Sequence, residues 1–225
     1  SPSEEIIEWV DAEGDSYLNF EATLNWTHDS RDTAIFPTKG TLQRLSGEAT
    51  LPGSELTCYK VSYSHRNFIP VFGDTVLSLK GEVGYGDSFG DTSALPFWEN
   101  YFAGGPVSLR GFKTYSLGPR DTPVGGTPDT GDPLGGNMKL LGSVELFHPA
   151  PFYPDTMRLS VFADGGSVFH TERGGYDSDE LRYSAGVGLS WLSPVGALKV
   201  SYATPFRADK FDEEERFQFT FGTNF

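Results

Sequence analysis

Nine segments of the chain alternate between apolar and polar residues, and this period of two constrains the fold more than any other feature of the sequence. Successive side chains of a β-strand point to opposite faces of the sheet, so a period of two predicts strands. In the first segment Leu18, Phe20 and Leu24 share one face, while Asn19 and Glu21 share the other. The predicted strands cover residues 17–28, 41–51, 57–66, 75–86, 139–148, 157–169, 181–192, 197–206 and 215–225. The sequence therefore predicts an all-β, antiparallel meander of sequentially paired strands.

The two faces of these strands indicate what surrounds the sheet. The cores of the apolar faces carry no charge, and they mix Ala and Gly with Tyr and Trp. A soluble β-sandwich also alternates, but its buried face is usually built from bulky Ile, Leu and Val. The polar faces hold Gly, Ser and isolated charges of both signs, which is typical of the lumen of a transmembrane barrel. We expect the apolar faces to point outward to lipid; the soluble sandwich is the alternative.

Composition excludes several other classes of protein. The net charge is −14, which argues against nucleic acid as a partner, because proteins that bind nucleic acid need clustered Lys and Arg. Cys58 is the single cysteine, so an internal disulfide framework and a cysteine-based zinc site are excluded. No apolar run approaches the ~18 residues of a transmembrane helix, and no signal peptide is visible. A transmembrane barrel requires no such run, since only every second strand residue faces lipid.

The connections between the strands support a barrel that is larger than this chain. Outer-membrane barrels alternate short turns with longer outer loops. Pro70–Asp74 and Ser193–Gly196 are tight, whereas 87–138, His170–Glu180 and Arg207–Glu214 are longer and fall on the other side. Residues 29–40 and Pro52–Glu55 are the two exceptions. An odd number of antiparallel strands cannot close a meander, so the chain is predicted to be part of a larger barrel.

No motif of covalent chemistry is present. The four histidines are scattered and show no metal-ligand spacing: His28, His65, His148 and His170. Residues 84–90 differ by one residue in spacing from a dinucleotide fingerprint and are not followed by a predicted helix. The acidic run Asp212–Glu215 is predicted to be a solvated loop, with a divalent-ion or lipopolysaccharide contact as the weaker alternative. We predict no catalytic residue, no metal and no cofactor.

The 87–138 connection is the most informative segment, because loops this long usually carry function. It contains Leu109, Arg110, Gly111 and Phe112, an arrangement suited to a tight tip that presents one guanidinium. The alternative is a solvated loop arginine.

At these residues the chain resembles the BamA family of outer-membrane barrel proteins. The segment 107–112 resembles the Val-Arg-Gly-Phe/Tyr motif of that family. Further similar stretches follow in order at 97–105, 182–196, 201–206 and 216–222. The resemblance covers essentially the whole chain.

The resemblance implies the fold and its place in the cell. The family barrel has sixteen strands and follows periplasmic POTRA domains, and this chain resembles its last nine strands. Residues 1–16 would then be an outer-loop segment with a short helix over 3–10, which Ser3 can cap. Residues 17–225 would be the C-terminal part of the barrel, with the 87–138 loop folded into the lumen. The implied location is the outer membrane of a Gram-negative bacterium.

The resemblance also implies the function and the partners. The parent protein would fold and insert β-barrel proteins and would catalyse no covalent reaction. Its partners would be nascent outer-membrane proteins, outer-membrane lipids and accessory assembly lipoproteins, the last through POTRA domains absent here. A two-partner secretion transporter or another translocating barrel is the related alternative; a porin or an outer-membrane hydrolase is the alternative from another class.

Two sets of site residues follow from the resemblance. In the family the loop arginine pairs with carboxylates of the inner wall, and the matching positions are Arg110, Glu145 and Asp164. The alternation independently assigns both carboxylates to the polar face. The last strand would be the assembly signal and one side of the working seam; its residues are Phe217, Phe219, Phe221, Gly222 and Phe225. An ordinary lipid-facing edge strand with interfacial anchoring is the alternative.

Overall fold

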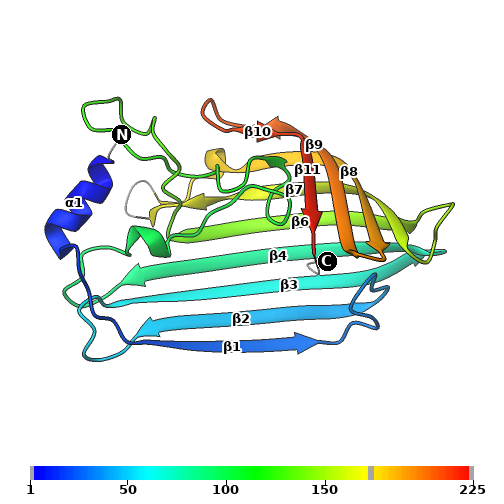
Figure 1. Cartoon of the computed structure of the whole chain (residues 1–225), viewed down its shortest axis with the longest axis horizontal. Coiled ribbons are helices and arrows are strands. Elements are labelled where there is room, and N and C mark those ends of the chain that lie inside the picture. Colours follow the sequence, from blue (N-terminus) through cyan, green and yellow to red (C-terminus); the bar gives the residue numbers. More distant parts are fainter. Residues whose placement is uncertain (1–2, 172–174, 223–225) are drawn as a thin grey trace.

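A nine-stranded antiparallel sheet dominates the computed structural model, which describes residues 3–171 and 175–222 (Figure 1). Strands that are adjacent in the sequence are hydrogen-bonded neighbours throughout, as the alternation predicts. The strands are β1 (Glu21–Asp29), β2 (Gly40–Thr50), β3 (Cys58–Phe72), β4 (Thr75–Ser88), β6 (Met138–Pro149), β7 (Met157–Phe169), β8 (Arg182–Ser193), β9 (Gly196–Arg207) and β11 (Phe217–Phe221). The predicted antiparallel meander is therefore confirmed.

Some strand ends differ from the prediction. β3 continues to Phe72, whereas the alternation ends at residue 66. The reason is that residues 68–72 are all apolar: Phe68 is buried on the inner face while Ile69 and Val71 are exposed on the outer face. β11 ends at Phe221, so the predicted strand 215–225 is shorter, and Phe225 lies outside the described residues.

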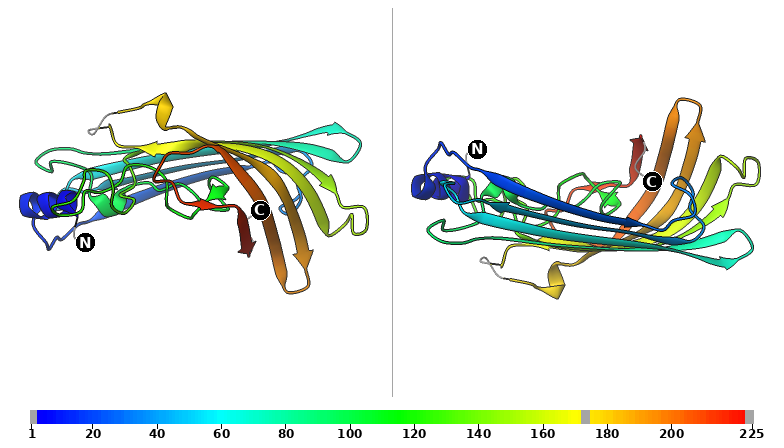
Figure 2. Two further views of the ribbon diagram at one scale, coloured as in Figure 1. Left: turned by 90° about the horizontal axis from the view of Figure 1, so that it is seen from above. Right: turned by 90° about the horizontal axis from the view of Figure 1, so that it is seen from below.

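The sheet curls into a trough, and the long β4–β6 connection lies on its concave side (Figure 2). Small polar side chains of the concave face are buried, such as Ser184 and Ser201. Apolar side chains of the convex face are exposed, and Val187 retains 55% of its surface. This distribution is the reverse of a soluble sandwich and is that of a barrel wall with lipid outside. Among the described helices, none is long and apolar enough to cross a membrane.

The helix α1 (Glu4–Glu13) covers one end of the trough (Figure 1). The Ser3 hydroxyl accepts the N–H of Ile6 and caps the helix, and Gly14 ends it with φ +99°. The helix ends three residues later than the predicted 3–10, because the first residue able to stop it is Gly14. Its buried Trp9 packs edge-on against Phe97 and Trp98 of the β4–β6 connection.

The β4–β6 connection has local structure of its own. It contains the 3-10 turn η1 (Phe97–Glu99) and the two-residue strand β5 (Gly111–Phe112). β5 pairs with β10 (Glu214–Glu215), which precedes the last strand of the sheet. The connection begins and ends in the middle of the sheet, at β4 and β6, and the β5–β10 pairing joins it to the C-terminal end as well.

Candidate functional site

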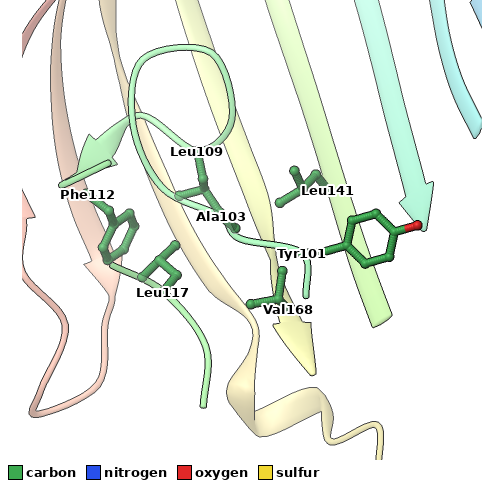
Figure 3. Close-up of a cluster of buried hydrophobic side chains, with 7 residues drawn as sticks. All are labelled: Tyr101, Ala103, Leu109, Phe112, Leu117, Leu141 and Val168. Atoms are coloured by element: carbon green, nitrogen blue, oxygen red, sulfur yellow. The ribbon is translucent and has the colours of Figure 1, made fainter. Parts of the chain in front are cut away.

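The β4–β6 connection packs its apolar side chains onto the inner face of the sheet (Figure 3). Leu109 and Phe112 of the predicted loop motif are fully buried. Together with residues of β6 and β7 they form one cluster: Tyr101, Ala103, Leu109, Phe112, Leu117, Leu141 and Val168. The main apolar core of the described residues therefore lies on the lumen side and is made by a loop.

Gly111 allows the chain to turn directly after the arginine. Its φ is +92°, a region that favours glycine. A Cβ at this position would stand 3.2 Å from the Ala203 methyl and 3.3 Å from Pro205 on β9. The residue therefore combines a left-handed backbone with a close approach to the wall.

Arg110 lies in the lumen with only 4% of its surface exposed. Its Nε and Nη2 donate to the two carboxylate oxygens of Asp164, each at 2.7 Å, and Nη1 donates to Glu145 Oε1 at 2.9 Å. The structure thus brings together the three residues expected to pair. The two parallel bonds to Asp164 are the fork geometry that a guanidinium provides and an ammonium does not.

Residues that the sequence did not single out complete this site. The Arg110 guanidinium carbon stands 3.3 Å from the centre of the Phe162 ring, and Nη2 also reaches Ser143 Oγ at 3.2 Å. Ser160 Oγ donates to Glu145 at 2.8 Å, and Lys199 Nζ lies 3.4 Å from the same carboxylate. All four added residues, Ser143, Ser160, Phe162 and Lys199, lie on the inner face of their strands. The two cations Arg110 and Lys199 thus face the two carboxylates Glu145 and Asp164.

The loop motif has a second anchor on the last strand. Gln218 of β11 is buried and faces the lumen. Its Nε2 donates to the Phe112 carbonyl at 2.7 Å, and its Oε1 accepts the Gly111 N–H at 3.2 Å. Gln218 was not predicted as a site residue; the signal was its place on the polar face between Phe217 and Phe219.

The aromatic residues predicted for the seam lie on the opposite face of β11. Phe217, Phe219 and Phe221 each retain more than half of their surface, between 58% and 64%. Gly222 follows the strand with φ +136°. The structure therefore separates the last strand into a lipid face and a lumen face that holds the loop.

The polar groups of the site are occupied by one another, so the arrangement holds a loop in place. Its donors are directed at carboxylate, hydroxyl and carbonyl oxygens of the same chain. In the described part of the chain, no group of three His, Cys, Asp or Glu side chains gathers as a metal site would require.

Comparison with known proteins places this geometry in a family context. Residues 2–225 match the model of the Omp85 superfamily domain. The chain is 37% identical over 233 residues to the outer membrane protein assembly factor BamA of Neisseria meningitidis, covering 92% of the chain and 29% of that protein. It is 28% identical over 200 residues to a sorting and assembly machinery component 50 homolog of Xenopus tropicalis, covering 82% of the chain and 41% of that protein.

A solved structure has the same fold. The crystal structure of BamA from Haemophilus ducreyi lacking POTRA domains 1–3 superimposes with a TM-score of 0.89 at 32% identity. The match covers 97% of this chain and 47% of that one. The chain thus spans less than half the length of each of these three proteins.

Proposed function

Because the chain belongs to the Omp85 superfamily and forms the wall of an outer-membrane barrel, we propose that it is the C-terminal barrel part of a BamA-like assembly factor. In this role residues 17–225 are barrel wall and residues 1–16 cover its outer end. The parent protein folds and inserts β-barrel proteins and catalyses no covalent reaction. Its clients are nascent outer-membrane proteins, and accessory lipoproteins bind parts of the parent outside this chain.

One observation carries the proposal: β11 is a five-residue strand, and within the described residues β9 is its only neighbour in the sheet. Its second edge presents backbone N–H and C=O groups. Lipid cannot satisfy such groups, so a free edge at membrane depth is a template for another strand. A client strand that adds to this edge would gain main-chain hydrogen bonds as it enters the membrane.

The two faces of β11 have different tasks in this proposal. Phe217, Phe219 and Phe221 hold the strand in the lipid, while Gln218 ties it to the loop motif inside the lumen. The Arg110 site fixes the loop against β6 and β7. The edge that meets the client is thereby supported from the lumen and still open toward its neighbour.

Site-specific cross-linking in the full-length protein tests this role. A photo-reactive residue at position 219 should capture client strands, or the first strand of the parent barrel, during active assembly. Position 144 is the matched control, because Val144 is also a half-exposed, outward-facing residue but lies on β6 between two neighbours. Equal capture at both positions, or capture at neither, would contradict the proposed seam.

A further inference from the structure

A hollow lies inside the lumen at the end opposite to α1, where the short turns are. It is a cavity of about 440 Å³, within the roughly 300–1,000 Å³ typical of sites for small ligands. The β1–β2 connection lies at the same end of the sheet (right-hand end of Figure 1). It reaches the cavity, since the Phe36 ring covers the Arg158 guanidinium at 4.6 Å. The walls come from β3, β4 and β6–β9, from the β1–β2 connection, and from the β3–β4 and β6–β7 turns.

Three cations line this cavity: Arg66, Arg158 and Lys199. Lys199 lies near Glu145 of the loop site, but no carboxylate of the described residues forms an ion pair with either arginine. Arg66 donates through Nε to Ser78 Oγ at 3.0 Å, and it stands opposite Lys80 in the β3–β4 register. Like charges placed opposite one another are unfavourable. Arg158 donates through Nη1 to the carbonyls of Pro154 and Met157, so its remaining donors and both charges are available for an anion.

The cavity also has apolar walls. The Arg66 guanidinium lies 5.1 Å from the centre of the Phe68 ring, and Phe147 lines the wall beside Lys199. Phe36 has φ +54°, a region that costs a non-glycine residue free energy and that persists only where the surroundings hold it. Aromatic rings stacked on guanidinium groups present an apolar surface directly beside the charge.

Two carboxylates stand at the mouth of the cavity. Asp74 and Asp155 lie on exposed turns at this end of the sheet and take part in the lining. An anion with two or more charges would be repelled by this rim, whereas a single carboxylate would reach the arginines with less opposition. The rim therefore favours a monoanion over a phosphate.

We propose that this cavity binds one polypeptide carboxylate together with the apolar side chain beside it. The guanidinium donors of Arg66 and Arg158 take the carboxylate, since their planar forks match its two oxygens. Phe36, Phe68 and Phe147 contact the apolar group. The lining strand residues lie on the lumen face of the sheet, away from lipid, and the carboxylate we propose is that of a polypeptide. This binding does not depend on the assembly role, so failure of the seam cross-links would leave it unaffected.

Isothermal titration calorimetry on the full-length protein in lipid nanodiscs tests the site, with protein-free nanodiscs as the blank. The probe is N-acetyl-L-phenylalanine, which carries one carboxylate and one phenyl ring. Saturable binding is expected, with its carboxamide analogue at least about tenfold weaker, because the amide lacks the charge that the arginines recognise. Phenyl phosphate should also bind more weakly than the carboxylate.

Three kinds of variant sharpen the test. Arg66→Gln and Arg158→Gln should each lower the affinity for N-acetyl-L-phenylalanine about tenfold. Arg44→Gln should leave that affinity unchanged, because Arg44 lies on the lumen face of β2 outside the cavity. The double variant Asp74→Asn/Asp155→Asn should bind phenyl phosphate more tightly; it removes no packing and serves even if an arginine variant fails to fold. No saturable binding, equal binding of the amide, or equal losses in Arg44→Gln would each overturn the proposal.

Discussion

Removing the Arg110 side chain is the sharpest test of how the loop is held. The Arg110→Ala change deletes four side-chain hydrogen bonds, two of them to Asp164. Glu145 keeps Ser160 and Lys199, so most of the cost falls on Asp164, whose carboxylate is 1% exposed and loses its cation. Breaking one partner of a buried pair costs about 3–5 kcal/mol, and the partly compensated Glu145 places this case near 3 kcal/mol.

That free energy should appear as opening of the loop and not as loss of the barrel wall. Each ~1.4 kcal/mol corresponds to a factor of ten, so the open population should rise about a hundredfold. The assay is the rate of limited proteolysis within the β4–β6 connection, with heat-modifiable gel mobility as the measure of an intact barrel. Arg110→Lys should give an intermediate rate, because an ammonium keeps the charge but loses the fork.

A double-mutant cycle with Asp164→Ala decides whether the residues act as one unit. The double variant should cost less than the sum of the single changes, because each single change already breaks the same contact. Strictly additive effects on the proteolysis rate would refute the reasoning, as would a distance measurement that places Arg110 outside the lumen.

Three further perturbations follow from the structure. Gln218→Leu should destabilise the docked loop by about 1–3 kcal/mol in the same proteolysis assay, since it leaves the Gly111 N–H and the Phe112 carbonyl without partners. Thr220→Val on the same strand is the control and should have little effect. Gly111→Ala should cost more than about 1 kcal/mol because of its φ of +92° and its approach to β9, seen as faster loop cleavage. Hydrogen bonds from the Thr38 hydroxyl and from backbone N–H groups lower the pKa of Asp32 to about 2. The stabilisation that Asp32 gives the β1–β2 turn should therefore be complete above about pH 4 and lost as the pH falls through 2. NMR titration of the carboxyl checks this, and an unshifted pKa would contradict it.

The alternation of residues was sufficient to predict the strands and their inner faces, because a barrel wall exposes its apolar face and hides its polar one. It failed where both faces are apolar, as at residues 68–72 of β3. It also could not predict the path of the β4–β6 connection, which has no period. The pairing of Arg110 with Glu145 and Asp164 was expected from the family resemblance, whereas the pattern indicated only the polar face of the two carboxylates.

The residues that were missed share one physical reason. The alternation placed Lys199 and Gln218 on the correct face. Which polar side chains meet across the lumen depends on strand register and sheet curvature, and a local sequence pattern predicts neither. The helix, by contrast, was visible from the cap at Ser3 and the stop at Gly14, since both signals are local.

The double anchoring of the loop has a consequence for the order of folding. Arg110 contacts Asp164 across 54 positions of sequence, and Gly111 contacts Gln218 across 107. Contacts of such high sequence separation form late, because the entropy of closing the intervening chain must be met first. The loop can lock against β6 and β7 before β11 joins the sheet, but its second lock forms only when β11 is in place. A docked β5–β11 contact therefore reports that β11 has joined the sheet, and a variant whose β11 cannot pair lacks that contact even when most of its sheet has formed.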